Sequence, residues 1–326
     1  MDKLFGVTIG DSSGIGPEIL LKAFRQGKVT VPIVAFGDMG ALECYNERLA
    51  YGVPLLRITG PAGYAPGPLN VIDAGIVSRR DVTVGKLSEK SGRAAREYVV
   101  TAARAALHQE IAAMVTLPMN KEATQLSDPH FTGHTELIGR VCGVKDVTIM
   151  LVSEQLVVTH VSTHVSLAAA IARAKTDRIE KIIALTYEAM QRLKPNPRIA
   201  VAGLNPHAGE HGLFGDEEEK EIKPAVEWAQ RQGMPVEGPL PPDTLFHLAV
   251  RKKQFDAVVC MYHDQGHIPL KLLDFEGGIN VTLGLPIIRT SVDHGTAFDI
   301  AGRGVASTAS FLFALQFAER LVKGQG

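Results

Sequence analysis

The chain has 326 residues, 45% hydrophobic and 21% charged, and is therefore long enough for one large or two ordinary domains with packed cores. Lys and Arg number 34 against 35 Asp and Glu, so no long-range field attracts nucleic acid or an anionic membrane. The three widely spaced cysteines argue against a disulfide framework and are typical of reduced thiols in a cytoplasmic protein. The N-terminus shows no signal or anchor pattern.

Short β-branched runs alternate along the chain with longer stretches of helical period. Strands are predicted at residues 4–9, 31–36, 111–116, 147–152, 156–160, 199–203, 257–261 and 279–283. Helices are predicted at residues 16–25, 89–108, 177–193, 217–232 and 307–322. This alternation predicts an α/β fold with helices on both faces of a largely parallel sheet. The three-residue gap between 147–152 and 156–160 instead predicts an antiparallel hairpin.

Three histidines follow three of the predicted strands. They are His164, His207 and His263, the last within the sequence MYHDQGH at 261–267. Ligands of open α/β sheets bind beyond the carboxyl ends of the strands, so these imidazoles are expected to converge. Any one of them alone would more often be a packing group, but three in equivalent positions predict a divalent metal site with positions left open for substrate.

Two small-residue segments have an open interpretation. Residues 10–18, GDSSGIGPE, follow the first strand and open the first helix, with neither a GxGxxG nor a GxxxxGK[ST] pattern. A structural turn and a ligand loop are equally compatible with that segment. Residues 291–302 bracket two acids and a histidine with small residues, and their spacing alone assigns no role.

Cations held by apolar or proline-rich segments form the last group of candidates. They are Lys121, Lys271 and Arg289. Together with Asn280 and the pair His134-Thr135 they are suited to bind a phosphate or a carboxylate, because Arg offers two parallel donors and Lys a point charge.

Seven motifs in order resemble the 4-hydroxythreonine-4-phosphate dehydrogenase family. They lie at residues 10–18, 118–121, 131–136, 204–210, 238–244, 261–266 and 280–302. The resemblance implies a two-domain α/β/α subunit of the isocitrate and isopropylmalate dehydrogenase type, with a cleft between the domains and an NAD site unlike the Rossmann fingerprint. It further implies a homodimer. We expect a first domain of residues 1–120 plus 290–326 and a second of 121–289 that carries the metal ligands and the dimer interface.

The resemblance also assigns roles to individual residues. Metal ligands are His164, His207 and His263, in agreement with their strand-end positions. Substrate contacts are His134, Thr135, Lys271, Asn280 and Arg289. The nucleotide loop contains Asp293, His294, Gly295 and Ala297. A proton acceptor is also required, and Asp243, Asp264 and Lys271 are the candidates.

The expected reaction is metal-dependent, NAD-linked oxidation, with decarboxylation, of a 4-phosphorylated 3-hydroxy acid. Residues 267–273 and Pro241-Pro242 look more like the branch acting on 4-phospho-D-threonate or 4-phospho-D-erythronate than the vitamin B6 branch acting on 4-hydroxy-L-threonine 4-phosphate. Three imidazoles accept zinc, cobalt, nickel, magnesium or manganese. Alternatives are a dehydrogenase of an unphosphorylated dihydrodiol carboxylate, a non-catalytic metal and phosphate-binding protein, and a metal-assisted hydrolase.

Overall fold

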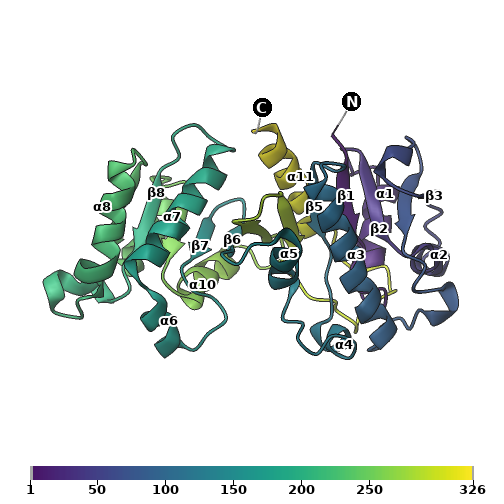
Figure 1. The fold of residues 1–326 in the computed structure, drawn as a ribbon, viewed down its shortest axis with the longest axis horizontal. Helices are drawn as coiled ribbons and strands as arrows, with labels where there is room; N and C mark the ends of the chain where they lie inside the picture. Colours follow the sequence, from purple (N-terminus) through teal and green to yellow (C-terminus); the bar gives the residue numbers. More distant parts are fainter. Residues whose placement is uncertain (1–2, 325–326) are drawn as a thin grey trace. The chain divides into compact units, whose positions relative to one another are not determined.

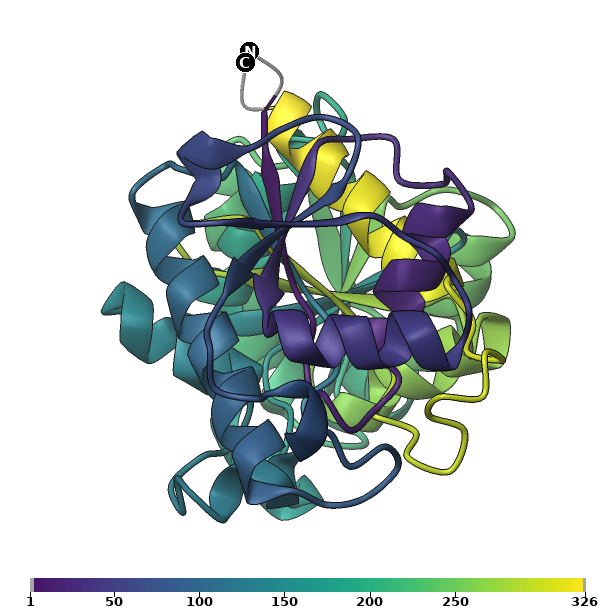
Figure 2. The same ribbon diagram turned by 90° about the vertical axis from the view of Figure 1, so that its right-hand side faces the viewer.

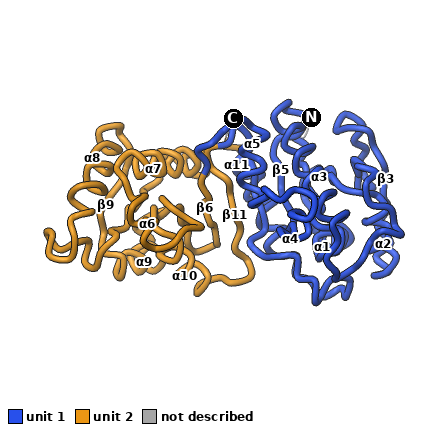
Figure 3. Tube along the Cα trace, turned by 60° about the horizontal axis from the view of Figure 1, so that its bottom comes forward, with its two compact units in different colours: residues 1–147, 285–322 blue, residues 148–284, 323–326 orange. Residues whose placement is uncertain are grey.

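The computed structural model describes residues 3–324, which divide into two compact units (Figure 3). Unit 1 contains residues 3–147 and 285–322, and unit 2 contains residues 148–284 and 323–324. The sequence-based division had assigned 121–147 to the second domain. In the structure this segment forms helices α4 (Lys121–Gln125) and α5 (His134–Cys142), which pack on α3 (Glu89–Leu107) inside unit 1.

The described part of unit 1 has six strands in one parallel arrangement, ordered β3-β4-β2-β1-β5-β12 (Figure 1). Their bounds are β1 (Phe5–Thr8), β2 (Ile33–Gly37), β3 (Leu55–Ile58), β4 (Leu69–Asp73), β5 (Ala113–Thr116) and β12 (Arg289–Val292). The runs are short and β1, β2, β5 and β12 are buried along their length, as expected for parallel strands covered on both faces.

Helices cover both sides of these strands. Besides α3, α4 and α5, unit 1 contains α1 (Gly16–Arg25), α2 (Met39–Arg48) and α11 (Ala309–Lys323). Figure 2 shows α3 on one side of the strands and α11 on the other. The buried face of α3 is rich in alanine, which lets it lie close to β1, β2 and β5.

Unit 2 has a mixed sheet, and its described strands are ordered β11-β6-β7-β10-β8-β9. Their bounds are β6 (Thr148–Val152), β7 (Val157–His160), β8 (Ile199–Ala202), β9 (Val236–Leu240), β10 (Ala257–Cys260) and β11 (Ile279–Leu283). The β6–β7 pair is antiparallel, which confirms the predicted hairpin, whereas β7, β10, β8 and β9 are parallel. The helices are α6 (Leu167–Arg173), α7 (Thr176–Gln191), α8 (Lys223–Arg231), α9 (Pro242–Val250) and α10 (His263–Leu273).

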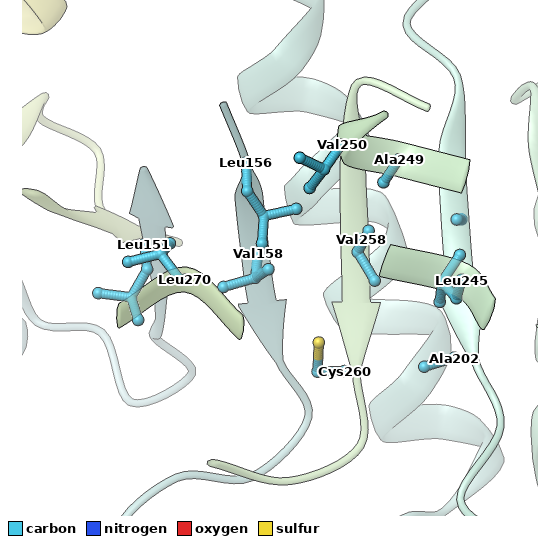
Figure 4. Close-up of a cluster of buried hydrophobic side chains, with 11 residues drawn as sticks. Leu151, Leu156, Val158, Ala202, Leu245, Ala249, Val250, Val258, Cys260 and Leu270 are labelled. Carbon is cyan, nitrogen blue, oxygen red and sulfur yellow. The ribbon is translucent and has the colours of Figure 1, made fainter. Parts of the chain in front are cut away.

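The core of unit 2 lies between β7, β10 and β8 and the helices α9 and α10 (Figure 4). Val158 of β7 contributes to this cluster, whereas Thr159 points to the opposite face, where its Oγ1 is 2.8 Å from Oγ1 of Thr186 on α7. Because side chains alternate along a strand, His160 returns to the side of Val158 and reaches α10. The last residue of β7 therefore projects a buried imidazole toward the segment that begins with His263.

The three cysteines are free thiols. Cys260 is buried in the core of unit 2, while Cys44 and Cys142 are partly buried. In the described range, no helix combines the length and the apolar character needed to cross a bilayer.

The contact of α3 with α4 depends on a glycine. A Cβ added at Gly92 would lie 2.3 Å from the backbone carbon and oxygen of Ala123. We expect Gly92→Ala to lower the free energy of unfolding by roughly 1–3 kcal/mol, despite the better helix propensity of alanine, because two backbones must separate. Urea unfolding measures the change. Gly60→Ala is the control, since nothing lies within 4 Å of its added Cβ, and an equal loss in both variants would contradict the packing argument.

Candidate functional site

The three predicted metal ligands follow three strands that lie next to one another. Strand β10 pairs in parallel with β7 on one side and with β8 on the other. His164 follows β7, His207 follows β8, and His263 is the first residue of α10 directly after β10. Since carboxyl ends of parallel strands meet at one edge of a sheet, the fold brings the three segments to the same edge.

Two polar side chains tie these strand ends together. Gln265, which is buried, accepts a hydrogen bond from the Met261 N–H at 2.7 Å and donates from Nε2 to the Gly203 carbonyl at 2.7 Å. Ser162 donates from Oγ to the Met261 carbonyl at 3.1 Å. The segment after β10 is therefore joined to both neighbouring loops. Gln265 lies within the MYHDQGH segment but was not among the predicted site residues. Its position between two histidines at a strand end was a signal that it belongs to the site.

His164 and His263 lie beside the same cavity of about 490 Å³, which is also lined by Thr163, Tyr262 and Asp264 among others. Their ring centroids are 5.7 Å apart, with the planes inclined by 48°. Nδ1 of His263 is 2.6 Å from Oδ1 of Asp264. That contact occupies one ring nitrogen and leaves Nε2 for a ligand, an arrangement typical of metal-binding histidines whose other nitrogen meets a carboxylate.

Two further histidines pack behind His263. The ring of His267 stacks on that of His263 with centroids 3.5 Å apart and planes inclined by 11°. Nδ1 of His267 is 3.2 Å from Nε2 of His160, which is fully buried. Burial, followed by the neighbouring imidazoles of His267 and His263, lowers the pKa of His160 to about 3. This ring is therefore neutral at physiological pH and supports the stack without adding positive charge.

His207 lies in an unusual backbone segment. Residues 207–211 all have positive φ, between 42° and 79°, and only Gly209 among them is a glycine. A left-handed conformation costs roughly 1–2 kcal/mol for each non-glycine residue, so surrounding contacts must hold this turn. The His207 ring is 6.1 Å from that of Phe214. Within residues 3–324, no three His, Cys, Asp or Glu side chains are placed so as to surround a metal ion.

Unit 1 contains a separate group of predicted substrate contacts. Arg289 at the start of β12 is 3% exposed, and its Nε and Nη2 donate to Oγ1 of Thr116 at 3.1 and 2.6 Å. Burial lowers the pKa of Arg289 to about 9, so the guanidinium remains cationic at neutral pH. His134 begins α5, and burial together with the charges of Arg289 and Lys121 lowers its pKa to about 3.

The imidazole of His134 is therefore neutral, and its buried Nε2 makes no hydrogen bond to the described residues. An orphaned acceptor next to two cations is well suited to a hydroxyl group or an acidic phosphate proton. Helix α5 has Gly133 at its N-cap without a side-chain cap, so the backbone N–H groups at Thr135 and its neighbours add positive potential there.

The remaining predicted substrate contacts and the candidate proton acceptors belong to unit 2. Lys271 lies on α10 with its Nζ 5.4 Å from the centre of the Phe275 ring, and Asn280 is partly buried on β11. Of the candidate proton acceptors, Asp243 is exposed in the first turn of α9, and Asp264 is the partner of His263. The contact with His263 indicates an orienting role for Asp264.

The segment 10–18 supports the predicted nucleotide loop. The Ile15 N–H donates to the Thr296 carbonyl at 3.0 Å, and buried Glu18 accepts from the N–H groups of Gly302 and Ala306, each at 2.9 Å. These bonds hold the loop that contains Asp293, His294, Gly295 and Ala297 from one side. No neighbour lies within 4 Å of a Cβ added at Gly295, which leaves room beside that backbone.

The Ser12-Ser13 pair is satisfied by a small hydroxyl cluster. Oγ of Ser91 is 2.7 Å from that of Ser12 and 3.0 Å from that of Ser13, and Oγ of Ser13 is 3.2 Å from Oγ1 of Thr83. All three serines are buried. The turn at 12–13 is consequently fixed by side chains of α3 and the loop before it.

Asp11, next to this cluster, is fully buried, and its Oδ2 has no partner in the described chain. Burial raises its pKa from 3.8 to about 6, although the hydrogen bond from the Ser13 N–H acts to lower it. The folded state then keeps a proton that the unfolded chain releases, so the contribution of Asp11 to stability declines as the pH rises from about 4 to about 6.

We expect Asp11→Asn to remove this decline. The stability of the variant relative to the parent should rise by about 2 kcal/mol between pH 4 and pH 7, which denaturant unfolding at a series of pH values measures. Asp81→Asn is the control, because Lys90 and Ser78 lower the pKa of exposed Asp81 to about 2 and its relative stability should stay flat over this range. A flat profile for Asp11→Asn as well would show that Asp11 is ionised throughout.

Comparison with solved structures first defines the class of fold. A β-decarboxylating dehydrogenase from Thermococcus kodakarensis aligns with a TM-score of 0.51 at 14% identity, over 99% of this chain and 84% of that one. An isocitrate dehydrogenase from Methylococcus capsulatus gives 0.50 at 13% identity, over 99% and 87%. At such identities the likeness concerns the fold alone, and it confirms the predicted α/β type.

The family follows from closer matches. The model of the pyridoxal phosphate biosynthetic protein PdxA family matches residues 29–318, so the chain belongs to this family. D-threonate 4-phosphate dehydrogenase of Cupriavidus necator is 44% identical over 320 residues, 96% of this chain and 95% of that protein. 4-Hydroxythreonine-4-phosphate dehydrogenase of Beijerinckia indica subsp. indica is 43% identical over 98% and 96%.

Solved structures of similar sequence support the same family assignment. A crystal structure of 4-hydroxythreonine-4-phosphate dehydrogenase from Klebsiella pneumoniae has a TM-score of 0.90 at 41% identity and covers 99% of both chains. A terephthalate 1,2-cis-dihydrodiol dehydrogenase from Burkholderia xenovorans LB400 has a TM-score of 0.71 at 31% identity, over 99% of this chain and 98% of that one. The predicted resemblance is thereby confirmed, and the chain is a dehydrogenase of this family.

Proposed function

We propose that the chain catalyses metal-dependent, NAD-linked oxidation and decarboxylation of a 4-phosphorylated 3-hydroxy acid, D-threonate 4-phosphate, its erythronate isomer or 4-hydroxythreonine 4-phosphate. The observation that carries the proposal is the delivery of three histidines by the ends of β7, β10 and β8. The relatives that act by name on two of these substrates support it, and their similar identities, 44% and 43%, do not separate the two.

Three imidazoles are donors that suit a divalent ion, and binding would have to bring His207 toward the other two, because no three such side chains surround an ion within residues 3–324. His263 has one nitrogen engaged by Asp264, and His164 lines the same cavity, so both rings lie where an ion could meet them. His207 would supply the third from the adjacent strand end. Bound there, zinc, cobalt, nickel, magnesium or manganese would favour ionisation of the substrate hydroxyl and stabilise the negative charge that develops on loss of carbon dioxide.

The chain's own residues would bind and orient the substrate. Arg289 and Lys121 supply positive charge for a phosphate or carboxylate, and His134 offers Nε2 to a hydroxyl or acidic proton. Thr135, Lys271 and Asn280 complete the proposed contacts. Buried Arg289, fixed by two bonds to Thr116, is the anchor of this set, because a rigid guanidinium loses little freedom on binding.

Hydride from the carbinol carbon would pass to NAD, and the hydroxyl proton to a base. Asp243 and Lys271 are the proposed acceptors, since Asp264 is already engaged with His263. Asp293, His294, Gly295 and Ala297 would contact NAD from the loop that Glu18 holds. A stiff loop with space beside Gly295 supports this role.

We expect the purified protein to form NADH and carbon dioxide from at least one of the three phosphorylated acids, and a chelator to abolish the reaction until metal is restored. His263→Ala should lower kcat/KM by at least about 100-fold, the order seen when one electrostatic stabiliser is lost. His247→Ala, at an exposed histidine of α9, should match the parent. If chelators leave NADH formation unchanged, the proposed metal dependence is wrong.

The alternative is oxidation of an unphosphorylated dihydrodiol carboxylate, which the match to the terephthalate dihydrodiol dehydrogenase favours. In that case turnover should not depend on a substrate phosphate. Binding without NADH formation from either substrate class would instead identify a non-catalytic protein.

We further propose that the chain forms a homodimer through α10 and the residues after it. Ile268, Leu272 and Phe275 are 62%, 85% and 77% exposed and recur at helical spacing, which gives an uncovered apolar face. We expect Leu272→Asp to shift the protein from dimer to monomer in sedimentation velocity, because a charge would be buried without a partner. A parent that sediments as a monomer would contradict the proposal.

A further inference from the structure

One buried carboxylate, that of Glu218, holds the segment leading into the left-handed turn 207–211, which carries His207. Glu218 is 2% exposed. Its Oε1 accepts hydrogen bonds from the N–H groups of Leu204 and Asn205, both at 2.7 Å, and its Oε2 accepts from Nδ2 of Asn205 at 2.9 Å. Three donors just before the turn thus converge on this side chain.

The carboxylate also lies close to Gly203, which precedes the turn, and to Gly209, which lies within it. A Cβ added at Gly203 would lie 3.3 Å from Oε1 of Glu218, and one added at Gly209 would lie 2.8 Å from Oε2. Gly209 itself has a φ of +79°. The turn therefore closes over Glu218, and both glycines are needed for this close approach.

The local helix geometry selects Glu218 among three consecutive glutamates. Residues 218–222 form a π-helical turn before α8, a feature frequent at functional sites. Glu217 reaches only Nδ2 of Asn205, at 2.7 Å, while Glu219 is exposed and pairs with Lys223. Only Glu218 of the three points under the turn.

Burying the Glu218 carboxylate costs more free energy than a neutral side chain would cost if its role were only structural. The carboxylate forms no ion pair with Lys or Arg in the described chain, and a buried charge needs such a partner or full hydrogen bonding. A negative charge below the turn, however, adds to the attraction of that turn for a cation. The hydrogen bonds of Glu218 fix the backbone before the turn, and its negative charge favours a cation bound by His207.

We propose that Glu218 is the positioning residue for His207: by holding the strained turn 207–211 it sets the affinity of the three-histidine site for a divalent cation. The inference rests on the proposed function, because it presupposes that His164, His207 and His263 bind metal. Gln265 donates a hydrogen bond to the Gly203 carbonyl, so two buried side chains, Gln265 and Glu218, hold the loop before the turn begins.

The test compares Glu218→Gln with Glu219→Gln, the same substitution one residue along at an exposed position. In Glu218→Gln an amide NH₂ meets Nδ2 of Asn205, so one hydrogen bond and the charge are lost while the side-chain volume is kept. Zinc affinity is measured by competition with a chelator. We expect a loss of about 10- to 100-fold for Glu218→Gln, the range found when partners of metal ligands are removed, and an unchanged value for Glu219→Gln.

Hydrogen exchange of the metal-free protein provides a second readout. The amides of Leu204 and Asn205 should exchange faster in Glu218→Gln only, because the neutral amide oxygen that replaces Oε1 accepts their hydrogen bonds less strongly than a carboxylate oxygen does. If Glu218→Gln fails to fold, Asn205→Ala is measured instead. It removes the side-chain bonds to Oε2 of Glu218 and Oε2 of Glu217 and keeps the two backbone bonds to Glu218, so it should produce a smaller loss of zinc affinity, and an unchanged affinity overturns the inference.

Equal zinc affinity in Glu218→Gln and the parent overturns the inference while leaving the proposed function intact. A parent that binds no zinc, cobalt, nickel, magnesium or manganese overturns both. Lower thermal stability with unchanged zinc affinity assigns Glu218 a structural role only, and that result also overturns the inference.

Discussion

The hydrogen bonds of Gln265 are the interaction on which the site of unit 2 depends. With one amide they join the start of α10 to the loop after β8, and Ser162 extends the connection to the loop after β7. Parallel pairing brings the strand ends to one edge, but it does not fix the loops beyond them. A buried amide that satisfies a donor on one loop and an acceptor on another supplies the missing constraint, since either group left unpaired would carry a desolvation cost.

Much of this arrangement could be predicted from the sequence. Every predicted strand and helix occurs with ends within two residues, except that the helix predicted at 217–232 divides into a π-helical turn, Glu218–Ile222, and α8. The short β-branched runs and the longer amphipathic stretches are regular enough to be identified locally. Four strands were missed. Strands β3 and β9 are only partly buried, and β9 contains glycine and proline, whereas β4 and β12 are short runs that include polar residues. The helices α2, α4, α5, α6, α9 and α10 were missed as well, and α10 begins with polar residues of the site and contains Pro269.

Some residues of the candidate site could be predicted from local sequence pattern, and others could not. Position after a strand was sufficient to select His164, His207 and His263, because strand ends can be identified from local pattern. The supports Gln265, Glu218 and Glu18 bond to groups far along the chain, and no local pattern reports a contact of Glu18 with Gly302. The conformation of 207–211 was also beyond prediction, since left-handed backbone at Ala208 or Glu210 contradicts the preference of these residues.

The division of the chain has a consequence for the order of folding during synthesis. Unit 2 is built almost entirely from one uninterrupted stretch, residues 148–284, whereas unit 1 needs β12 and α11 from the far end. Strand β12 pairs with β5, which leaves the ribosome about 170 residues earlier, at translation rates of roughly 5–20 residues per second. Until then the nascent chain exposes an unpaired edge on β5 next to the completed β1, a surface that a chaperone has reason to cover.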